Sequence, residues 1–517
     1  MELAISKVSL KQHEGKTISL AGIIDSVAQT TGPTLFSLID GSGTLMLKGF
    51  DGAGVRAFPQ IKEGDTVKTM VQVKEFQGSL EGEIIRITKL EGPTSEQLRK
   101  DIEAEERKRA TVVPIPFLVK SQILDKLKER YIQAATEIRL AVVKNRPIIV
   151  RHHNDCDGYS SGYSLERAII PLIIKQHGGG KAPWEYFTRS PSMAPFYEIE
   201  DSIKDTANSL RDVAKFSNKM PLVVIVDTGS GSESLLGIRQ GKIHGADFIV
   251  VDHHFFEEDV TSPEVLVHVN PFVVGEDGAK FSAGMLCTEL ARFINPEVMV
   301  DHLPALSGMA DRIDNPTVIT EYLKIAEKKG YNKELLEDIA SLIDYVSTKL
   351  RFMEAREYIE VVFGDPIDKQ KALVSLMNPF IRTMQKRGLE IAKSTVKREK
   401  IGQCTLQLLF VEETFSRNAY PKPGQVVGML HDFFQEKEKN KNVVSIGVLS
   451  DLVTIRATEE SKFIVHDFLS VLQKNVPEAF PEGGGHKSAG ALRFVPAQRE
   501  KVLVALRTYL TKVQSGK

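Results

Sequence analysis

Hydrophobic and polar residues alternate through the first 92 residues of the chain, a period typical of half-buried β-strands. The alternating segments are residues 18–24, 36–38, 45–47, 67–73 and 83–90. A turn-forming Asp-Gly-Ser-Gly stretch at 40–43 separates two of them, as in a hairpin. Short strands at this spacing predict a small barrel of the OB type over residues 1–92.

Two aromatic residues of this barrel, Phe50 and Phe76, have lysines nearby, Lys48 and Lys74. OB barrels often bind single strands by stacking bases on exposed aromatic rings, so these two residues are candidates for strand stacking. The alternative is that both rings belong to the barrel core. Barrels of this type also dock proteins, and the sequence does not separate nucleic acid from protein as the ligand.

Residues 93–146 are highly charged, and their apolar positions take on a helical spacing. The order Thr94-x-x-Gln97 matches a capping box and predicts a helix from residue 94 to 110. A second helix is expected over residues 118–144, where apolar residues recur every three or four positions. We interpret this segment as a helical connector with one face packed on the next domain.

From residue 147 the pattern changes to continuous apolar runs that alternate with helical segments. The runs occupy residues 148–150, 222–226, 248–251 and 265–269. Continuous runs indicate strands that are covered on both faces, which is typical of parallel sheets. A parallel sheet is therefore expected within residues 147–330.

A polar stretch, residues 151–158, directly follows the first of these strands. His153, Asp155 and Asp157 alternate within it, and on extended backbone they would share one face. Two carboxylates and an imidazole on one face form a good site for a divalent metal ion. The alternative is a polar turn with an aspartate that caps the next helix.

Two more strands of the sheet end in side chains of the same kind. The second strand ends at Asp227, and the third is followed by Asp252, His253 and His254. Because the carboxyl ends of parallel strands meet at one edge of a sheet, we expect these side chains to converge on one site. Asp311 follows a run of small residues in the helical segment after the sheet and could approach the same place.

The segment from residue 332 to 400 reads as helical and strand-free. Its end is basic, with Arg382, Lys386, Arg387, Lys393, Lys397, Arg398 and Lys400. These residues could line a groove as a phosphate-contacting wall or form a solvated helix face, and we prefer the wall.

A last α/β unit follows, with strands expected at residues 405–411, 443–449 and 491–494. Its signature is a glycine-rich stretch that contains Gly484, Gly485, His486 and Lys487. Consecutive glycines let backbone amides approach an anion closely, and the two side chains that follow can add hydrogen bonds to phosphate. The alternative is a flexible glycine loop.

Composition narrows the range of functions. The formal net charge of −1 rules out a global basic field, so any nucleic-acid surface must be local. The three cysteines are far apart and form no Cys-x-x-Cys pair, which argues against structural zinc and disulfides and favours a reducing cytosol. With no signal-peptide pattern at the start and no apolar run of membrane-spanning length, we expect a cytoplasmic protein.

These stretches together resemble the DHH phosphoesterases, in particular the archaeal RecJ-like single-strand exonucleases with DHH and DHHA1 domains. The matching DHH stretches are, in order, His153-x-Asp155-x-Asp157-Gly158, Asp227, Asp252-His253-His254 and Gly308-Met309-Ala310-Asp311. Gly-Gly-Gly-His at 483–486 matches the DHHA1 signature, and the similarity covers about residues 147–510. The N-terminal barrel departs from bacterial RecJ, which carries its OB domain after the catalytic core, and looks like the archaeal arrangement.

The resemblance implies an α/β protein of several domains. They are an OB-type barrel (1–92), a helical connector (93–146), a parallel-sheet DHH catalytic domain (147–330), a helical insert (331–402) and a smaller α/β DHHA1 substrate-binding domain (403–517).

The resemblance also implies two divalent metal ions, with Mn²⁺ favoured and Mg²⁺ as a substitute. One ion would take His153, Asp155 and Asp227; the other would take Asp157, Asp227, His253 and Asp311. His254 would face the scissile phosphate, and Asp252 would orient the imidazoles. Arg456 matches the family's substrate-contacting arginine, although Ala457 follows it where serine is common, which puts one phosphate contact in doubt.

The activity implied is two-metal hydrolysis of single-stranded nucleic acid, with DNA favoured and RNA possible, to mononucleotides during DNA repair or replication. Cleavage from 3′ to 5′ is slightly preferred to the reverse, and a helicase or replisome partner is expected from the resemblance alone. Two alternatives remain, a phosphodiesterase for small substrates such as oligoribonucleotides or pAp, and a non-catalytic replisome or repair scaffold. The sequence leaves the polarity, the DNA or RNA preference, the oligomeric state and the partner open.

Overall fold

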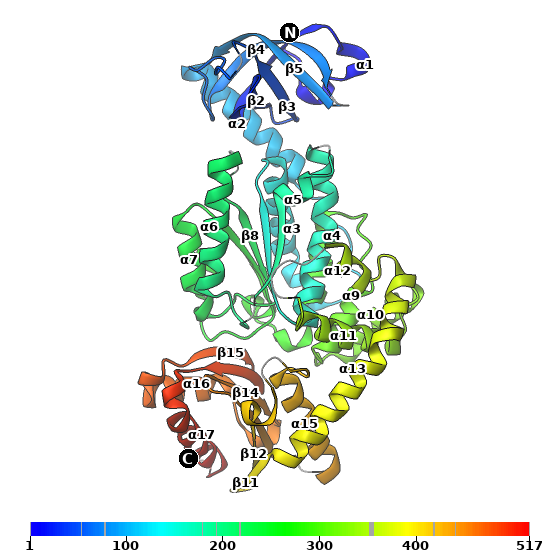
Figure 1. Cartoon of the computed structure of the whole chain (residues 1–517), viewed down its shortest axis with the longest axis vertical. Helices are drawn as coiled ribbons and strands as arrows, with labels where there is room; N and C mark the ends of the chain where they lie inside the picture. Colours follow the sequence, from blue (N-terminus) through cyan, green and yellow to red (C-terminus); the bar gives the residue numbers. More distant parts are fainter. Residues whose placement is uncertain are drawn as a thin grey trace.

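The computed structural model describes residues 2–52, 54–76, 79–177, 179–192, 194–216, 219–350, 356–416, 419–439 and 441–515. Figure 1 shows a β-barrel at one end, a parallel sheet with its helices in the middle, and a mixed sheet at the other end. The expected α/β class with an N-terminal OB-type barrel is confirmed. Among the described residues, no helix combines the length and the apolar composition that crossing a membrane requires.

The barrel closes in the order β1-β2-β3-β5-β4. Its strands are β1 (Thr17–Gln29), β2 (Thr34–Ile39), β3 (Thr44–Gly49), β4 (Thr66–Phe76) and β5 (Ser79–Lys89), preceded by η1 (Ile5–Lys7) and α1 (Leu10–His13). Alternation directs one set of side chains inward, and Leu20, Phe36 and Leu47 are fully buried there.

Helices α2 (Gly92–Ala110) and α3 (Gln122–Val143) connect the barrel to the sheet. The predicted capping box at Thr94 is wrong, because α2 already begins at Gly92, with Pro93 in its first turn and Thr94 inside the helix. The N-cap of α3 is Ser121, whose hydroxyl accepts a hydrogen bond from the Ile123 amide at 3.2 Å.

The central sheet is entirely parallel in the order β10-β9-β8-β6-β7. Its strands are β6 (Ile148–His153), β7 (Phe187–Ser192), β8 (Leu222–Val226), β9 (Asp247–Val251) and β10 (Val267–Val269). The covering helices are α4 (Cys156–His177), α5 (Ala182–Tyr186), α6 (Ile199–Phe216), α7 (Leu235–Ile243) and α8 (Ala283–Ile294). Alternate strand residues enter two different cores: Val224 packs with the α3 and α4 side, and Ile225 with the α7 side.

Five further helices extend the core on the α3 and α4 side. They are α9 (Leu303–Ala310), α10 (Pro316–Lys328), α11 (Lys333–Ser347), α12 (Arg356–Val362) and α13 (Ile367–Thr395). Leu342 of α11, Ile359 of α12 and Val374 of α13 belong to the same buried cluster as Val150 of β6. The last turns of α13 pack instead with the C-terminal unit, through Ala392.

The C-terminal sheet has the order β11-β12-β13-β14-β16-β15. Its strands are β11 (Lys397–Ile401), β12 (Cys404–Phe410), β13 (Val443–Val448), β14 (Leu452–Ala457), β15 (Glu482–His486) and β16 (Ala489–Arg493). The helices of this unit are α14 (Val411–Thr414), α15 (Pro423–Glu438), α16 (Val465–Asn475) and α17 (Arg499–Ser515).

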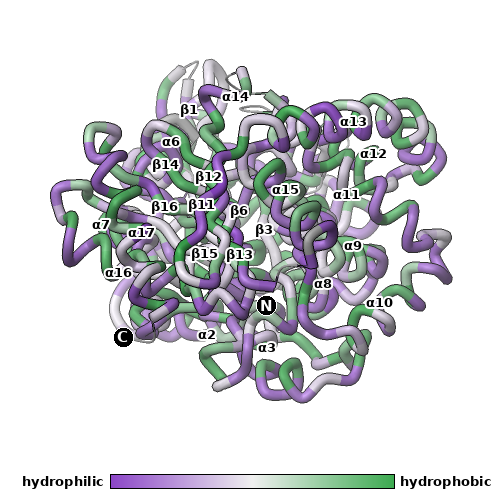
Figure 2. The backbone as a smooth tube through the Cα atoms, turned by 90° about the horizontal axis from the view of Figure 1, so that it is seen from below, coloured by the Kyte–Doolittle hydropathy of each residue, from purple (hydrophilic) through white to green (hydrophobic). Residues whose placement is uncertain are grey.

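One expectation for this end of the chain is wrong. The segment expected to be strand-free contains β11, a hydrophilic edge strand that pairs with β12 (Figure 2). The glycine-rich stretch, for which a flexible loop was the alternative, is largely β15, the opposite edge strand, which pairs with β16. Glycine and lysine have low strand propensity, so pairing within the sheet, and not local preference, makes these residues extended.

Candidate metal centre

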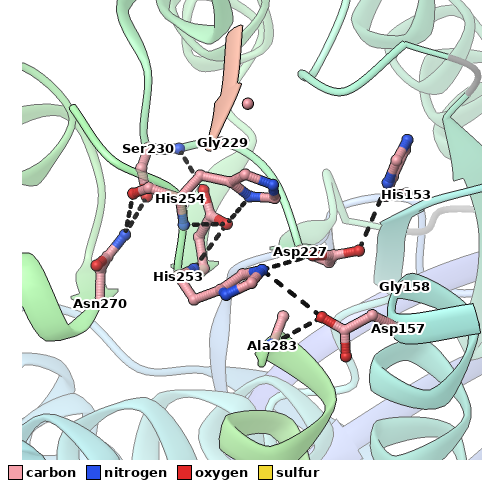
Figure 3. A network of polar contacts seen from close by, with 12 residues as sticks. His153, Asp157, Gly158, Asp227, Gly229, Ser230, His253, His254, Asn270 and Ala283 are labelled. Carbon is pink, nitrogen blue, oxygen red and sulfur yellow. Dashed lines mark hydrogen bonds and ion pairs between the residues drawn. The ribbon is translucent and has the colours of Figure 1, made fainter. Parts of the chain in front are cut away.

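The metal-capable residues predicted from the sequence lie together at the carboxyl ends of three adjacent parallel strands. His153 ends β6, Asp227 follows β8, and His253 comes just after β9. Asp155 and Asp157 lie at the start of α4, and Asp311 directly follows α9. Figure 3 shows Asp227 between His153 on one side and His253 on the other.

The first ligand group consists of His153, Asp155 and Asp227, whose ligand atoms all lie within 4.8 Å of one another. His153 Nδ1 is 2.8 Å from Asp155 Oδ2 and 3.6 Å from Asp227 Oδ2. The turn after β6 is tight, because a side chain on Gly158 would lie 2.2 Å from the His153 carbonyl. Glycine at this position therefore allows the three side chains to converge.

The second ligand group consists of Asp157, Asp227 and His253, all buried. His253 Nε2 lies 3.4 Å from Asp227 Oδ1, 3.7 Å from Asp157 Oδ2 and 3.6 Å from Asp311 Oδ2. Asp157 is fixed by the first amides of α8, since it accepts hydrogen bonds from Ala283 and Gly284 at 2.9 and 2.8 Å. Asp227 belongs to both groups and adopts a left-handed φ of 58°, a strain typical of functional sites.

The charges of the two groups fit bound cations. Burial, together with the carboxylates of Asp227 and Asp311, raises the pKa of Asp157 well above its ordinary value. Among the described residues, the buried atoms that lack a hydrogen-bond partner include Asp227 Oδ2 and both ring nitrogens of His253. Carboxylates that repel one another beside unused imidazole nitrogens are the donor set of a divalent metal site, and the mixed ligands suit Mn²⁺.

Asp252 also lies in a possible ligand group, with Asp227 and His254, but hydrogen bonds occupy both of its oxygens. Oδ1 accepts from the amides of His253 and His254 and lies 2.7 Å from His254 Nδ1, while Oδ2 accepts from the Ser230 amide at 3.0 Å. Burial alone would lower the pKa of His254, but the Asp252 carboxylate outweighs it and raises this pKa. Asp252 therefore orients the ring of His254, whereas it contacts only the backbone of His253.

The C-terminal sheet brings a fourth histidine to this place. His486, at the end of β15, stacks on His254 with ring centroids 4.9 Å apart, and its Nε2 is 3.7 Å from Asp311 Oδ1. Gly484 and Gly485 precede it on the same strand, and Lys487 is exposed in the turn that follows. Burial and the charge of Arg312 lower the pKa of Arg456 on β14, whereas the charges of Asp311 and Asp432 act to raise it.

Sequence comparison identifies a longer relative that matches nearly the whole of this chain. No protein-family model matches the sequence. An uncharacterized protein of Methanocaldococcus jannaschii is 35% identical over 524 aligned residues, which cover 96% of this chain and 69% of that protein. A solved DHH domain, from a member of the s1p family of ribosomal proteins, is also 35% identical, with a TM-score of 0.76 over 82% of this chain and 99% of that one.

The chain belongs to the DHH phosphoesterase family. Manganese-bound RecJ from Thermus thermophilus is 16% identical, with a TM-score of 0.51, and the match covers 80% of this chain and 59% of that one. At this identity the likeness shows a shared fold.

The candidate stacking residues of this DHH protein lie far from the metal-capable residues. Phe50 and Phe76 are 59% and 51% exposed, so neither ring belongs to the barrel core. Lys48 Nζ lies 3.6 Å from the ring centre of Phe76 and also pairs with Glu81. The barrel contacts the amino end of the sheet, where Asn145 donates to Asp25 at 2.9 Å. The length of β6, about 20 Å, separates this end of the sheet from His153.

The basic stretch after residue 382 also lies apart from this centre. Arg382 pairs with Asp338, and Lys393 lies over the ring of Phe433 at 4.2 Å. Lys397 and Arg398 belong to β11, the edge of the sheet opposite β15 and His486. These side chains do not line the metal-capable residues.

Sequence reasoning assigned no role to several residues that complete the centre. Asn270 donates to Ser230 Oγ at 2.9 Å and to the His254 carbonyl at 3.0 Å, and so fixes the loop after β9 (Figure 3). Arg312 reaches Asp432 of α15 at 2.9 Å, across the boundary between the two sheets. The signals were weak: an asparagine at a strand end, and an arginine directly after Asp311.

Proposed function

We propose that this DHH protein is a metal-dependent exonuclease that hydrolyses phosphodiester bonds of single-stranded nucleic acid and releases mononucleotides from one end. The observation that carries the proposal is the position of Asp227 in two ligand groups, one of which contains His253, whose ring centroid lies 5.0 Å from that of His486 in the C-terminal sheet. DNA is the favoured substrate and 3′ to 5′ the preferred direction, in DNA repair or replication. A helicase or replisome partner stays a prediction.

Two groups of residues would hold divalent ions, with Mn²⁺ favoured and Mg²⁺ possible. They are His153, Asp155 and Asp227 for one ion, and Asp157, Asp227, His253 and Asp311 for the other. Bound ions of this kind activate water for attack on phosphorus and neutralise charge on the phosphate oxygens.

The protein's own residues would hold the substrate and respond to its charge. His254, whose pKa is raised by Asp252, can in its protonated form donate a hydrogen bond to a phosphate oxygen as negative charge grows there. His486 and Arg456, with the amides near Gly484 and Gly485, would bind a neighbouring phosphate. Because these groups come from two domains, a flexible single strand fits between them more readily than a stiff duplex.

The direct test uses end-labelled single strands of about 20 nucleotides, longer than one OB domain covers. With Mn²⁺, we expect the strand labelled at its 3′ end to release labelled mononucleotide at once, and the 5′ label to appear only late. Early release of the 5′ label would reverse the proposed polarity. Cleavage of blunt duplex without any cleavage of single strands would contradict the proposal.

The two alternative functions give different results in the same assay. A small-substrate phosphodiesterase would hydrolyse dinucleotides much faster than long strands. A non-catalytic scaffold would cleave neither substrate, although the complete set of ligand side chains argues against this alternative.

The barrel provides a separate prediction. Replacing Phe50 and Phe76 by alanine should raise the KM for long strands roughly thirtyfold or more, since each of the two stacked bases contributes about 1–3 kcal/mol. Hydrolysis of dinucleotides should stay unchanged, because a dinucleotide at the metal centre is too short to reach the barrel. Met46→Ala, on an exposed barrel position, is the matched control. Equal KM values for wild type and the double variant would assign the barrel to a protein partner.

A further inference from the structure

Lys422 lies where the chain passes from one hydrophobic core to another. Tyr420, two residues earlier, belongs to the core that contains the parallel sheet, whereas Val426 and Leu430 pack with the end of α13. Lys422 is the N-cap residue of α15, the first long helix of the C-terminal unit. Its side chain is thus anchored by the C-terminal unit but points back into the DHH domain.

The Lys422 ammonium contacts the first metal-binding stretch directly. Nζ donates to the carbonyl of Asn154 at 2.6 Å and to the hydroxyl of Ser347 at 2.8 Å. The Ser347 hydroxyl in turn donates to the Asp344 carbonyl at 2.9 Å, within α11. A side chain 268 positions away in sequence therefore holds the peptide group just before Asp155.

Asp344 lies on the other side of Asp155 from Lys422 along the backbone. Burial raises the pKa of the Asp344 carboxyl to about 6, while the charge of Lys422 and the backbone of Cys156 act to lower it. Opposite charges, one from the helical segment and one from the C-terminal unit, thus act beside the peptide groups that flank Asp155. Partners that fix a ligand in this way usually matter to metal affinity almost as much as the ligands.

We propose that Lys422 and Asp344 are positioning residues that hold residues 154–156, and that they couple the seating of the C-terminal unit to metal binding by His153 and Asp155. This inference rests on the metal centre of the proposed function. It does not depend on which substrate is cleaved.

The sign of the effect separates positioning from simple electrostatics. A lysine close to a cation site repels the cation, so removing its charge alone should strengthen metal binding. Loss of positioning should weaken it. The two readings of Lys422 therefore predict opposite changes in the dissociation constant for a metal ion.

The experiment is calorimetric titration of the full-length protein with MnCl₂. Lys422→Met should raise the dissociation constant for Mn²⁺ by about 10- to 100-fold. Arg493→Met is the matched control, because Arg493 also bridges the two domains, by an ion pair with Glu198, but touches no metal-capable residue. The control should bind Mn²⁺ like the wild type. An unchanged or lower dissociation constant for Lys422→Met would overturn the inference.

A second variant moves the lysine without removing it. A side chain on Gly388 of α13 would lie 2.7 Å from Cδ of Pro421, so Gly388→Ala should displace the segment that carries Lys422. Mn²⁺ affinity should again fall, and an unchanged affinity would contradict the coupling even if Lys422→Met did not fold. Wild type that binds Mn²⁺ but cleaves no strand would defeat the proposed exonuclease and leave this inference standing.

Discussion

Replacing Asp227 by alanine is expected to lower the rate of strand hydrolysis by about a thousandfold or more. Asp227 is the one residue that belongs to both ligand groups, so its loss weakens both ions at once. Charge stabilisation by such ions contributes several kcal/mol to the transition state, and each 1.4 kcal/mol is about tenfold in rate. The measurement is single-turnover hydrolysis of an end-labelled strand at saturating Mn²⁺.

A second measurement separates loss of metal from loss of fold. Mn²⁺ should raise the melting temperature of the wild type, because a ligand that binds only the folded state stabilises it, by about 2.7 kcal/mol at a hundred times its Kd. Asp227→Ala should melt at a temperature independent of Mn²⁺. Asp467→Asn, at an exposed position on α16, is the control and should keep both activity and the Mn²⁺ effect. Near-normal hydrolysis by Asp227→Ala would show that the centre is elsewhere.

Replacing Asp252 by asparagine should have the second-largest effect, a loss of roughly a hundredfold in kcat. Asp252 accepts a hydrogen bond from His254 Nδ1, and this bond fixes the orientation of the ring and favours its protonated form. An amide keeps much of the shape of the carboxylate but removes the charge. His254 would then be neutral over more of the pH range and would lose its charge-assisted hydrogen bond to phosphate.

The pH dependence of activity should shift in a definite direction in this variant. The Asp252 carboxylate raises the pKa of His254, so removing the carboxylate lowers that pKa. If protonated His254 is the active form, activity is lost as the pH rises through this pKa. The loss should therefore occur at lower pH in Asp252→Asn than in the wild type. Mn²⁺ affinity should change little, because hydrogen bonds already occupy the Asp252 oxygens; a large fall would identify Asp252 as a ligand instead.

The position of the barrel has a consequence for how a long substrate would be held. The barrel and the C-terminal sheet, which carries His486, lie at opposite ends of the parallel sheet (Figure 1). A strand bound at both places would have to run along the DHH domain. Substrate length is therefore the variable that should separate the role of the barrel from that of the metal centre.

The sequence by itself determined the central sheet and the identity of its metal-capable residues. Continuous apolar runs specify strands buried on both faces, and parallel strands place their carboxyl ends at one edge. For this reason the sequence alone predicts that one site contains His153, Asp227 and His253. The closed barrel could be predicted likewise, because period-two alternation depends only on neighbouring residues.

The tertiary structure alone decided the contacts between segments that are distant in sequence. β15 is a strand because β16 pairs with it, although its glycines favour no strand. Its position brings His486 onto His254, and α15 brings Lys422 to the carbonyl of Asn154. Local patterns record which residues are buried and at what period, but not which distant side chain meets them. That partner is set by how the two cores pack, and only the folded chain shows it.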